Sequence, residues 1–370
     1  MDDGADPLLP DYGGACIDGV VPALLDRHGG APPWLPAPAA GADQVVLLVL
    51  DGLGWEQLRE RAELAPTLSA MEGGPVTTVA PSTTSTALTS LTTGAAPAAH
   101  GVIGYRMRMM GTDILNVLRW RTVAGEDVRQ TMPPETVQRL EPFAGTKPPV
   151  VTRAEFAESG FTRAHLAGVR MLGWRVLSTL VMRVADELAE GTDFVYAYYD
   201  GVDKVAHEYG LGRYYEAELG AVDRLVADLI AVLPPGAALV VCADHGQVDV
   251  GDNVVPLRRE VMELASLLSG EGRMRWIHAR AGCRDRLAAA ARSCHGDQAW
   301  VRTRDEVVAE NWFGGRLAPE IEARLGDVVL AAKQPVAFLD PADTGNIRLR
   351  SRHGSLTAAE MLVPLIATRA

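Results

Sequence analysis

The sequence predicts an α/β fold in which a mostly parallel central sheet carries helices on both faces. Three apolar runs, at residues 45–50, 194–199 and 238–242, each end within two residues of an aspartate. Continuous apolar runs of this length are typical of strands buried on both faces. Amphipathic segments at 173–191 and 214–236 separate them. Strand alternating with helix implies parallel pairing through right-handed crossovers.

The three aspartates, Asp51, Asp200 and Asp244, indicate where a site would form. In open α/β sheets, ligands bind outside the carboxyl ends of the strands, so we expect these ends to converge. Asp200 is expected to support the site or cap a helix. Two stretches, 106–150 and 252–330, fit the alternation less well. We predict that they are insertion or cap segments of a single domain spanning 1–370.

Composition restricts the classes of partner. The 370 residues carry a net charge of −12, which argues against binding of nucleic-acid polymers, because clustered Lys and Arg hold phosphate backbones. An anionic small molecule would need a local source of positive charge. The N-terminal stretch lacks a targeting pattern, no apolar run is long enough to span a membrane, and the four cysteines form no CxxC pair. We therefore expect a cytoplasmic protein without membrane contact, of unpredicted oligomeric state.

Candidate metal ligands occur in two short motifs. Asp203 and His207 stand four residues apart in "DKVAH", so on a helix they share one face and can hold a cation. An exposed helical ion pair is the equally weighted alternative. Asp244 and His245 are adjacent at a strand end, and Gly246 permits the sharp turn that would let both reach a metal.

Two further candidates are weak alone. Asp51 in "DGLG" is typical of a turn or a helix cap, and His353 in "SRHGS" is typical of a surface loop. Their combination with the two motifs is more informative. Together, the three candidate aspartates Asp51, Asp203 and Asp244 and the three histidines form an oxygen and imidazole set suited to Zn²⁺ or Mn²⁺. The set is Asp51, Asp203, His207, Asp244, His245 and His353.

A stretch rich in hydroxyls, residues 77–101, raises the choice between a flexible linker and a nucleophile site. Residues 84–93 have helical periodicity, and Gly94 stands where it can end that helix. A hydroxyl at the helix start would lie near free backbone N–H groups, which favour a phosphoryl group. Helical phase does not separate Thr84 from Thr83 or Ser85. The other hydroxyls are expected on the helix surface and in turns.

The order of these motifs carries a family resemblance. Asp51, "PSTTSTALTSLTTGAAPAAHG", "DGVDKVAH", "ADHG" and "RHG" together resemble the alkaline phosphatase superfamily, and within it the nucleotide pyrophosphatase/phosphodiesterase branch. That branch has a Pro-x-x-Thr motif, matched by Pro81 and Thr84. A Thr-Gly-x-x-Pro-x-x-His-Gly motif follows and is matched from Thr93 to Gly101. The resemblance covers about 45–105, 190–250 and 345–370, and implies an alkaline-phosphatase-like fold.

The resemblance also implies two divalent metal ions, Zn or Mn, and selects Thr84 as the nucleophile. Metal coordination is one of few ways to activate a threonine hydroxyl, and two ions stabilise the attacking and leaving oxygens. By carry-over from the family, Thr84 joins the ligands of one ion. The first ion would take Asp51, Thr84, Asp244 and His245, and the second would take Asp203, His207 and His353.

One position departs from the branch. Many members carry an Asn five residues beyond the motif histidine, whereas this chain has Tyr105. The phenol can donate a hydrogen bond to a phosphoryl oxygen or pack against a nucleotide base, and a purely structural tyrosine carries equal weight. We predict Tyr105 to be substrate-binding and His100 to be structural.

The functional prediction is a two-metal phosphoric diester hydrolase. It would hydrolyse a nucleotide phosphodiester or pyrophosphate through a phospho-threonine intermediate. Similarity in size to actinobacterial cyclic di-AMP phosphodiesterases makes cyclic di-AMP, or its linear dinucleotide product, the candidate substrate. The alternatives are a phosphomonoester or phosphonate hydrolase of the same superfamily, and a catalytically silent nucleotide-binding protein.

Overall fold

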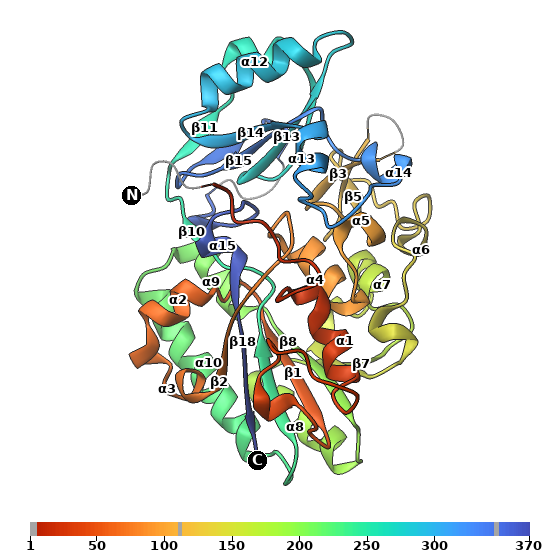
Figure 1. Ribbon diagram of the computed structural model, residues 1–370, viewed down its shortest axis with the longest axis vertical. Coiled ribbons are helices and arrows are strands. Elements are labelled where there is room, and N and C mark those ends of the chain that lie inside the picture. The colour runs from red at the N-terminus through yellow and green to blue at the C-terminus, as the bar shows by residue number, and fades with distance from the viewer. Residues whose placement is uncertain (1–5, 110–112, 344–347) are drawn as a thin grey trace.

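The central sheet has seven strands in the order β2-β18-β9-β1-β8-β6-β7 (Figure 1). It is seen in a computed structural model that describes residues 6–109, 113–343 and 348–370. Strand β18 is antiparallel to both β2 and β9, and all other pairs in this sheet are parallel, so the predicted fold class is confirmed. The strands are β1 (Val45–Leu50), β2 (Glu72–Thr77), β6 (Pro149–Arg153), β7 (Arg170–Trp174), β8 (Phe194–Tyr199), β9 (Ala238–Cys242) and β18 (Leu362–Arg369).

The three strands that end near an aspartate lie side by side. β1 pairs in parallel with β8 on one side and β9 on the other, with Val45 opposite Phe194 and Ala238. Every residue of the three strands is buried, which explains their unbroken apolar sequences. Their carboxyl ends therefore meet at one edge of the sheet.

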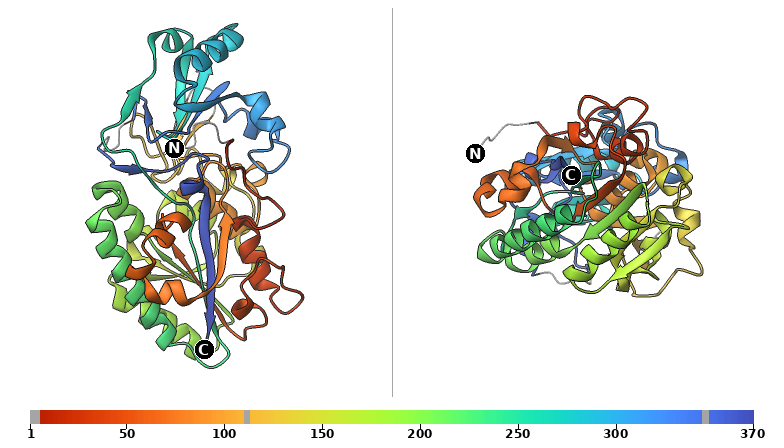
Figure 2. Two further views of the ribbon diagram at one scale, coloured as in Figure 1. Left: turned by 60° about the vertical axis from the view of Figure 1, so that its left-hand side comes forward. Right: turned by 90° about the horizontal axis from the view of Figure 1, so that it is seen from below.

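Helices cover both faces of this sheet (Figure 2). On one face, α8 (Leu177–Ala189) packs on α10 (Arg213–Ala231), and these helices match the two predicted amphipathic segments. The other face carries α1 (Val20–Leu25), α4 (Thr84–Thr93) and α7 (Gly160–His165). Among the described residues, no helix is both long and apolar enough to cross a membrane.

Helix α4 corresponds to the helix predicted in the hydroxyl-rich stretch, and Gly94 ends it in a left-handed conformation (φ 66°). The expectation that its other hydroxyls lie on a surface is wrong, because residues 84–92 are all buried. The neighbouring helices α1 and α7 contact α4. Some of these hydroxyls bond within the helix instead, as Thr89 does to the Ser85 carbonyl (2.6 Å) and Thr92 to the Leu88 carbonyl (2.8 Å).

A second sheet lies beyond the carboxyl edge of the first (Figure 1). It is antiparallel, in the order β12-β13-β15-β14, and α12 (Arg284–His295) packs on it over a separate hydrophobic core. Most of the segment 252–330 is used here, and the pairing of β11 (Val254–Pro256) with β16 (Ala337–Leu339) extends the unit to Leu339. The strands are β12 (Ala265–Gly270), β13 (Met274–Ala279), β14 (Ala299–Thr303) and β15 (Val328–Ala332).

A third, three-stranded sheet comes from the segment 106–150. It contains β3 (Arg106–Met109), β4 (Asp113–Asn116) and β5 (Arg121–Thr122), and residues 110–112 of this segment lie outside the described residues. Strand β3 contacts β12 of the second sheet. The end of the segment, from Pro149, enters the central sheet as β6.

Candidate active site

Two buried carboxylates stand at the carboxyl edge of the central sheet. Asp51 directly follows β1, and Asp244 lies two residues beyond β9. The Gly52 amide donates to Asp244 Oδ1 (3.0 Å), and the Tyr198 hydroxyl of β8 donates to Asp51 Oδ2. The remaining oxygens, Asp51 Oδ1 and Asp244 Oδ2, are buried without a hydrogen-bond partner among the described residues. Both lie 3.4 Å from His245 Nε2.

Three histidines present their Nε2 atoms to this region. Each Nδ1 lies within hydrogen-bond distance of a backbone carbonyl oxygen. A carbonyl only accepts, so Nδ1 carries the hydrogen and each Nε2 lone pair is free to bind a metal. The distances are 3.0 Å from His245 to Gly246, 2.7 Å from His207 to Ser351 and 2.9 Å from His353 to Ser82.

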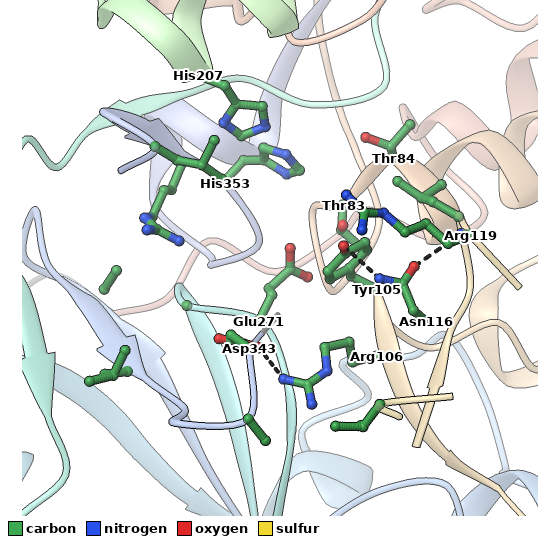
Figure 3. Close-up of a pocket in the computed structure, with 18 of the residues that line it drawn as sticks. Thr83, Thr84, Tyr105, Arg106, Asn116, Arg119, His207, Glu271, Asp343 and His353 are labelled. Atoms are coloured by element: carbon green, nitrogen blue, oxygen red, sulfur yellow. Dashed lines mark hydrogen bonds and ion pairs between the residues drawn. The ribbon is translucent and has the colours of Figure 1, made fainter. Parts of the chain in front are cut away.

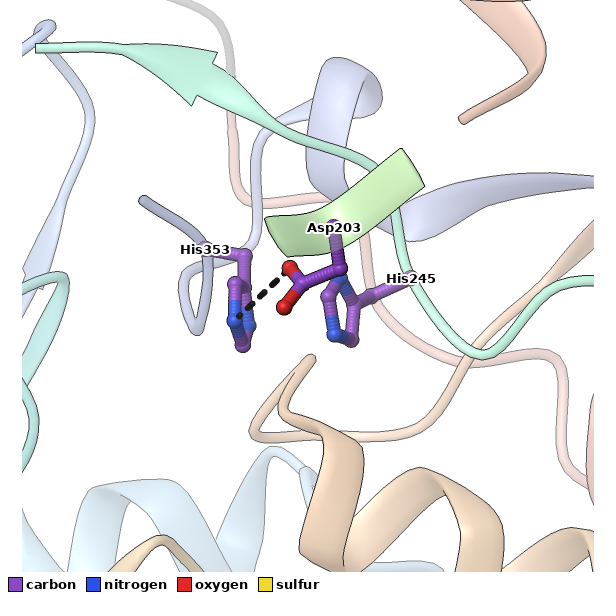
Figure 4. A group of neighbouring side chains, drawn as sticks. All are labelled: Asp203, His245 and His353. Atoms are coloured by element: carbon purple, nitrogen blue, oxygen red, sulfur yellow. Dashed lines mark ion pairs between the residues drawn. The ribbon is translucent and has the colours of Figure 1, made fainter. Parts of the chain in front are cut away.

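Helix α9 (Gly201–Tyr209) brings a third carboxylate to the histidines. Asp203 and His207 share one helical face, and Asp203 Oδ1 lies 3.2 Å from His207 Nε2. The same oxygen lies 3.8 Å from His353 Nε2 (Figure 4) and accepts a hydrogen bond from Gln247 (2.5 Å). The His353 ring stacks on the His245 ring with centroids 3.5 Å apart. The six predicted carboxylate and imidazole ligands thus gather at one place.

Two overlapping groups of donor atoms result, each within 4.8 Å internally. One contains Asp51, Asp244 and His245, and the other contains Asp203, His245 and His353. The resemblance assigned His245 to a single ion, whereas here it belongs to both groups. It therefore lies between the two predicted metal positions.

The Thr84 hydroxyl faces the same point. Thr84 is the first residue of α4, and its Oγ1 lies 3.1 Å from His245 Nε2. Helical phase left Thr83 and Ser85 as alternatives, but Ser85 donates to the Gly104 carbonyl (3.1 Å) and Thr83 lies beside Glu271. Of these three hydroxyls, the Thr84 hydroxyl is the one in contact with a predicted ligand.

The nearby Ser82 hydroxyl holds the His353 loop in place, a role that the sequence did not reveal. Ser82 donates to the Ser355 carbonyl (2.6 Å) and accepts from the Gly354 amide (3.2 Å), so it fixes the loop that carries His353.

Asp200 does not join the cluster of predicted ligands. It makes no side-chain capping hydrogen bond and is ion-paired with Arg153 (2.6 Å) and Lys204.

The electrostatics of the cluster favour a cation. Burial raises the pKa of Asp51 well above its usual range, and the carboxylates of Asp244 and Asp203 raise it further. Burial likewise raises the pKa of Asp244. Burial lowers the pKa of His353 well below its usual range, with His245 and His207 adding to the effect. Crowded carboxylates beside neutral imidazoles, with two unpartnered oxygens, fit divalent ions such as Zn²⁺ or Mn²⁺.

A pocket of about 530 Å³ opens onto the cluster and is lined by Thr84, His207 and His353 at its inner end (Figure 3). Tyr105 lines it as well. The Asn116 side chain of β4 donates to the Tyr105 hydroxyl (2.7 Å) and accepts from the Arg119 amide (3.0 Å). No sequence motif marked Asn116, because only the pairing of β3 with β4 brings it next to Tyr105.

Comparison with known proteins identifies the family of this chain. A family model described as type I phosphodiesterase / nucleotide pyrophosphatase matches residues 45–356. The chain belongs to this family. Its members are metal-dependent hydrolases, typically with two ions, so the resemblance stated from the sequence motifs is confirmed.

Solved structures share the fold at low sequence identity. Murine ectonucleotide pyrophosphatase/phosphodiesterase 5 is 17% identical, with a TM-score of 0.66 over 88% of this chain and 87% of its own. An inactive threonine-to-alanine variant of that protein is known in complex with AMP. Phosphonoacetate hydrolase from Sinorhizobium meliloti 1021 is 21% identical, with a TM-score of 0.62 over 91% of both chains. A search of curated protein sequences finds no match.

Proposed function

We propose that this family member is a two-metal phosphodiesterase that hydrolyses a nucleotide phosphodiester or pyrophosphate through a phospho-threonine intermediate on Thr84. The observation that carries the proposal is the 3.1 Å contact between Thr84 Oγ1 and His245 Nε2, at the point shared by both donor groups. One ion would be held by Asp51, Asp244, His245 and Thr84, and the other by Asp203, His207 and His353. The bound ions would lower the pKa of the attacking hydroxyl and offset charge on the phosphoryl oxygens.

The protein residues supply alignment and hydrogen bonds. Thr84 Oγ1 attacks phosphorus, the bond to the leaving alcohol breaks, and the hydroxyl proton is transferred to that alcohol through solvent. Water then attacks the phospho-threonine, and Thr84 regains its hydrogen. Because Tyr105 accepts from Asn116, its own hydrogen is free to be donated toward the phosphoryl group.

The size of the pocket supports a nucleotide rather than a small phosphate ester. Its volume of about 530 Å³ lies within the range of small-molecule sites, and apolar Leu118 and Leu339 line it beside the polar groups. Cyclic di-AMP and its linear dinucleotide remain the candidate substrates. Phosphomonoesters and phosphonates are the competing substrate classes.

The test is a comparison of turnover on bis-p-nitrophenyl phosphate, p-nitrophenyl phosphate, cyclic di-AMP and phosphonoacetate with added Mn²⁺ or Zn²⁺. We expect the diesters to react fastest and the Thr84→Ala variant to lose turnover while it retains bound metal. Preferred cleavage of the monoester or of phosphonoacetate would replace the proposed substrate class. Metal binding without turnover of any compound would support the catalytically silent alternative.

A further inference from the structure

The pocket concentrates positive charge in a chain whose net charge is −12. Five basic and three acidic side chains line it, and the two most buried carboxylates of the cluster, Asp51 and Asp244, are not among the lining residues. Positive charge beside a reaction centre favours anionic ligands. The basic lining residues are Arg106, Arg119, Arg121, Lys204 and Arg352, and the acidic ones are Asp203, Glu271 and Asp343.

Three of the basic side chains, Arg106, Lys204 and Arg121, already form ion pairs or hydrogen bonds within the protein. Arg106 is ion-paired with Asp340 (2.9 Å) and with Asp343. Lys204 is ion-paired with Asp200, and Arg121 donates to the Gly125 carbonyl (2.8 Å). The internal pairs hold the pocket walls together and leave these groups less free to bind a ligand.

Arg119 differs from these neighbours. Its backbone amide bonds to Asn116, yet its guanidinium makes no hydrogen bond or ion pair with any described residue. Figure 3 shows this side chain extending from the turn between β4 and β5 into the pocket, toward the side where Thr84 lies. A guanidinium offers several donors in a planar fork that matches phosphate and carboxylate oxygens.

Arg119 and Thr84 occupy different depths of the pocket. Thr84 is buried, with 8% of its surface exposed, whereas the side chain of Arg119 is exposed. The buried donor groups around Thr84 would receive the phosphoryl group that reacts. Arg119 is therefore placed to contact a different part of the same ligand.

We propose that the substrate carries a second anionic group, a phosphate or a carboxylate, and that Arg119 binds it. The inference rests on the proposed function, because it takes the group attacked by Thr84 as the first anion. A cyclic dinucleotide has a second phosphodiester. A linear dinucleotide with a 5′-phosphate has a terminal phosphate monoester. A dinucleoside monophosphate has only the group that is cleaved.

The test compares binding of two compounds that differ only in the second anion, the dinucleotide pApA and its analogue ApA. Calorimetry in the metal-loaded Thr84→Ala background prevents cleavage during the measurement. We expect pApA to bind about tenfold more tightly than ApA, and Arg119→Ala to bring this ratio close to one. Arg119→Lys should retain part of the preference. Arg183→Ala, which removes an exposed charge from α8, should retain all of it.

A parallel pair, phosphonoacetate and methylphosphonate, separates a carboxylate from a phosphate as the second group. A preference that depends on Arg119 in this pair alone would assign a carboxylate. The inference would be overturned if the two compounds of each pair bound with equal affinity, or if none of them bound. It would also be overturned if Arg119→Ala left the affinity ratio within each pair unchanged. Turnover is measured separately. If the binding preference depends on Arg119 but the protein cleaves none of the compounds, the proposed function is refuted and the inference about Arg119 is not.

Discussion

Several buried ionisable residues at the site destabilise the folded protein when no cation is bound. Asp51 is buried next to Asp244, and each leaves one oxygen without a hydrogen-bond partner among the described residues. His245 and His353 stack with their Nε2 atoms facing the same region. Such groups destabilise a protein unless a cation compensates them, so stability and metal binding should be coupled.

Asp51→Asn tests that coupling. In the metal-free protein the raised pKa of Asp51 means that the unfolded state loses its proton at lower pH than the folded state does, so stability falls as pH rises above the usual carboxyl range. We expect the variant without metal to be about 1–3 kcal/mol more stable than wild type at pH 7.

With Mn²⁺ or Zn²⁺ the order should reverse, because the variant loses a ligand. Thermal unfolding in chelator and in excess metal measures both conditions. Asp186→Asn on the exposed surface of α8 is the matched control and should show no reversal. A metal-free variant that is less stable than wild type would refute this account.

His100 gives a pH prediction away from the metal ligands. The Val102 amide donates to its Nδ1 (3.1 Å), so the hydrogen is on Nε2, which donates to the Ser90 hydroxyl (2.8 Å). Burial lowers the pKa of His100 to about 3. Between about pH 6.5 and 3 the unfolded state therefore binds a proton that the folded state does not, and stability falls on acidification.

His100→Asn should reduce the steepness of that fall by up to about 1.4 kcal/mol per pH unit. The asparagine oxygen can still accept from the Val102 amide. Denaturant unfolding at a series of pH values between 4 and 7 gives the slope, and His28→Asn at an exposed position serves as control. Identical slopes in wild type and His100→Asn would contradict the assignment of a neutral His100.

At the scale of elements, the small sheet of β3, β4 and β5 lines one side of the pocket and orients hydrogen-bond donors toward the site. The pairing of Arg106 with Asn116 across β3 and β4 sets the two strands in register. Asn116 then lies under the hydroxyl of Tyr105, and the turn that follows carries Arg119. Three polar side chains of the pocket thus depend on one element.

Tyr105→Phe should lower kcat about 10- to 100-fold, because the phenol hydrogen that would stabilise the phosphoryl oxygens is lost. Asn116→Ala should cause a smaller loss, since the phenol remains but is no longer held. Steady-state kinetics on a dinucleotide, with metal content measured in parallel, distinguish the two effects. Tyr214→Phe on the exposed side of α10 is the control. An unchanged kcat in Tyr105→Phe would assign the tyrosine a purely structural role.

At the scale of the whole molecule, the pocket is assembled from three separate units. Helix α9 and the loop that carries His353 supply the predicted ligands that line it, the small sheet supplies Tyr105 and Asn116, and the second sheet supplies Glu271. A buried ion pair joins the second sheet to the main body. Arg273 Nη2 lies 2.7 Å from Glu360 Oε2, and both side chains are fully buried.

Arg273→Met should destabilise the protein by about 3–5 kcal/mol, because it leaves the Glu360 carboxylate buried without its partner. The double variant with Glu360→Met should recover much of that loss, since it buries no unpaired charge. Chemical denaturation of the wild type, both single variants and the double variant gives the coupling energy. A double variant as unstable as the sum of the single variants would show that the two residues act independently.

Much of the central fold and of the candidate metal site could be predicted from short-range patterns. The apolar runs before Asp51 and Asp244 identify buried strands, and the spacing of Asp203 and His207 is satisfied by any regular helix. Hydrogen bonding along the backbone enforces such periodicities locally. Strand β18 was not foreseen, because its antiparallel position depends on where the end of the chain returns to the sheet.

The sequence by itself determined the fold class, the family, the helix that begins at Thr84 and the set of side chains that we predict as metal ligands. Each of these follows from neighbouring residues or from motifs that recur in a family. Only the tertiary structure decided that His245 contacts both donor groups, that Asp200 is engaged by Arg153, and that Asn116 and Arg119 enter the pocket. These relations join residues far apart in the chain, and they exist only once the strands are paired and the separate sheets are packed.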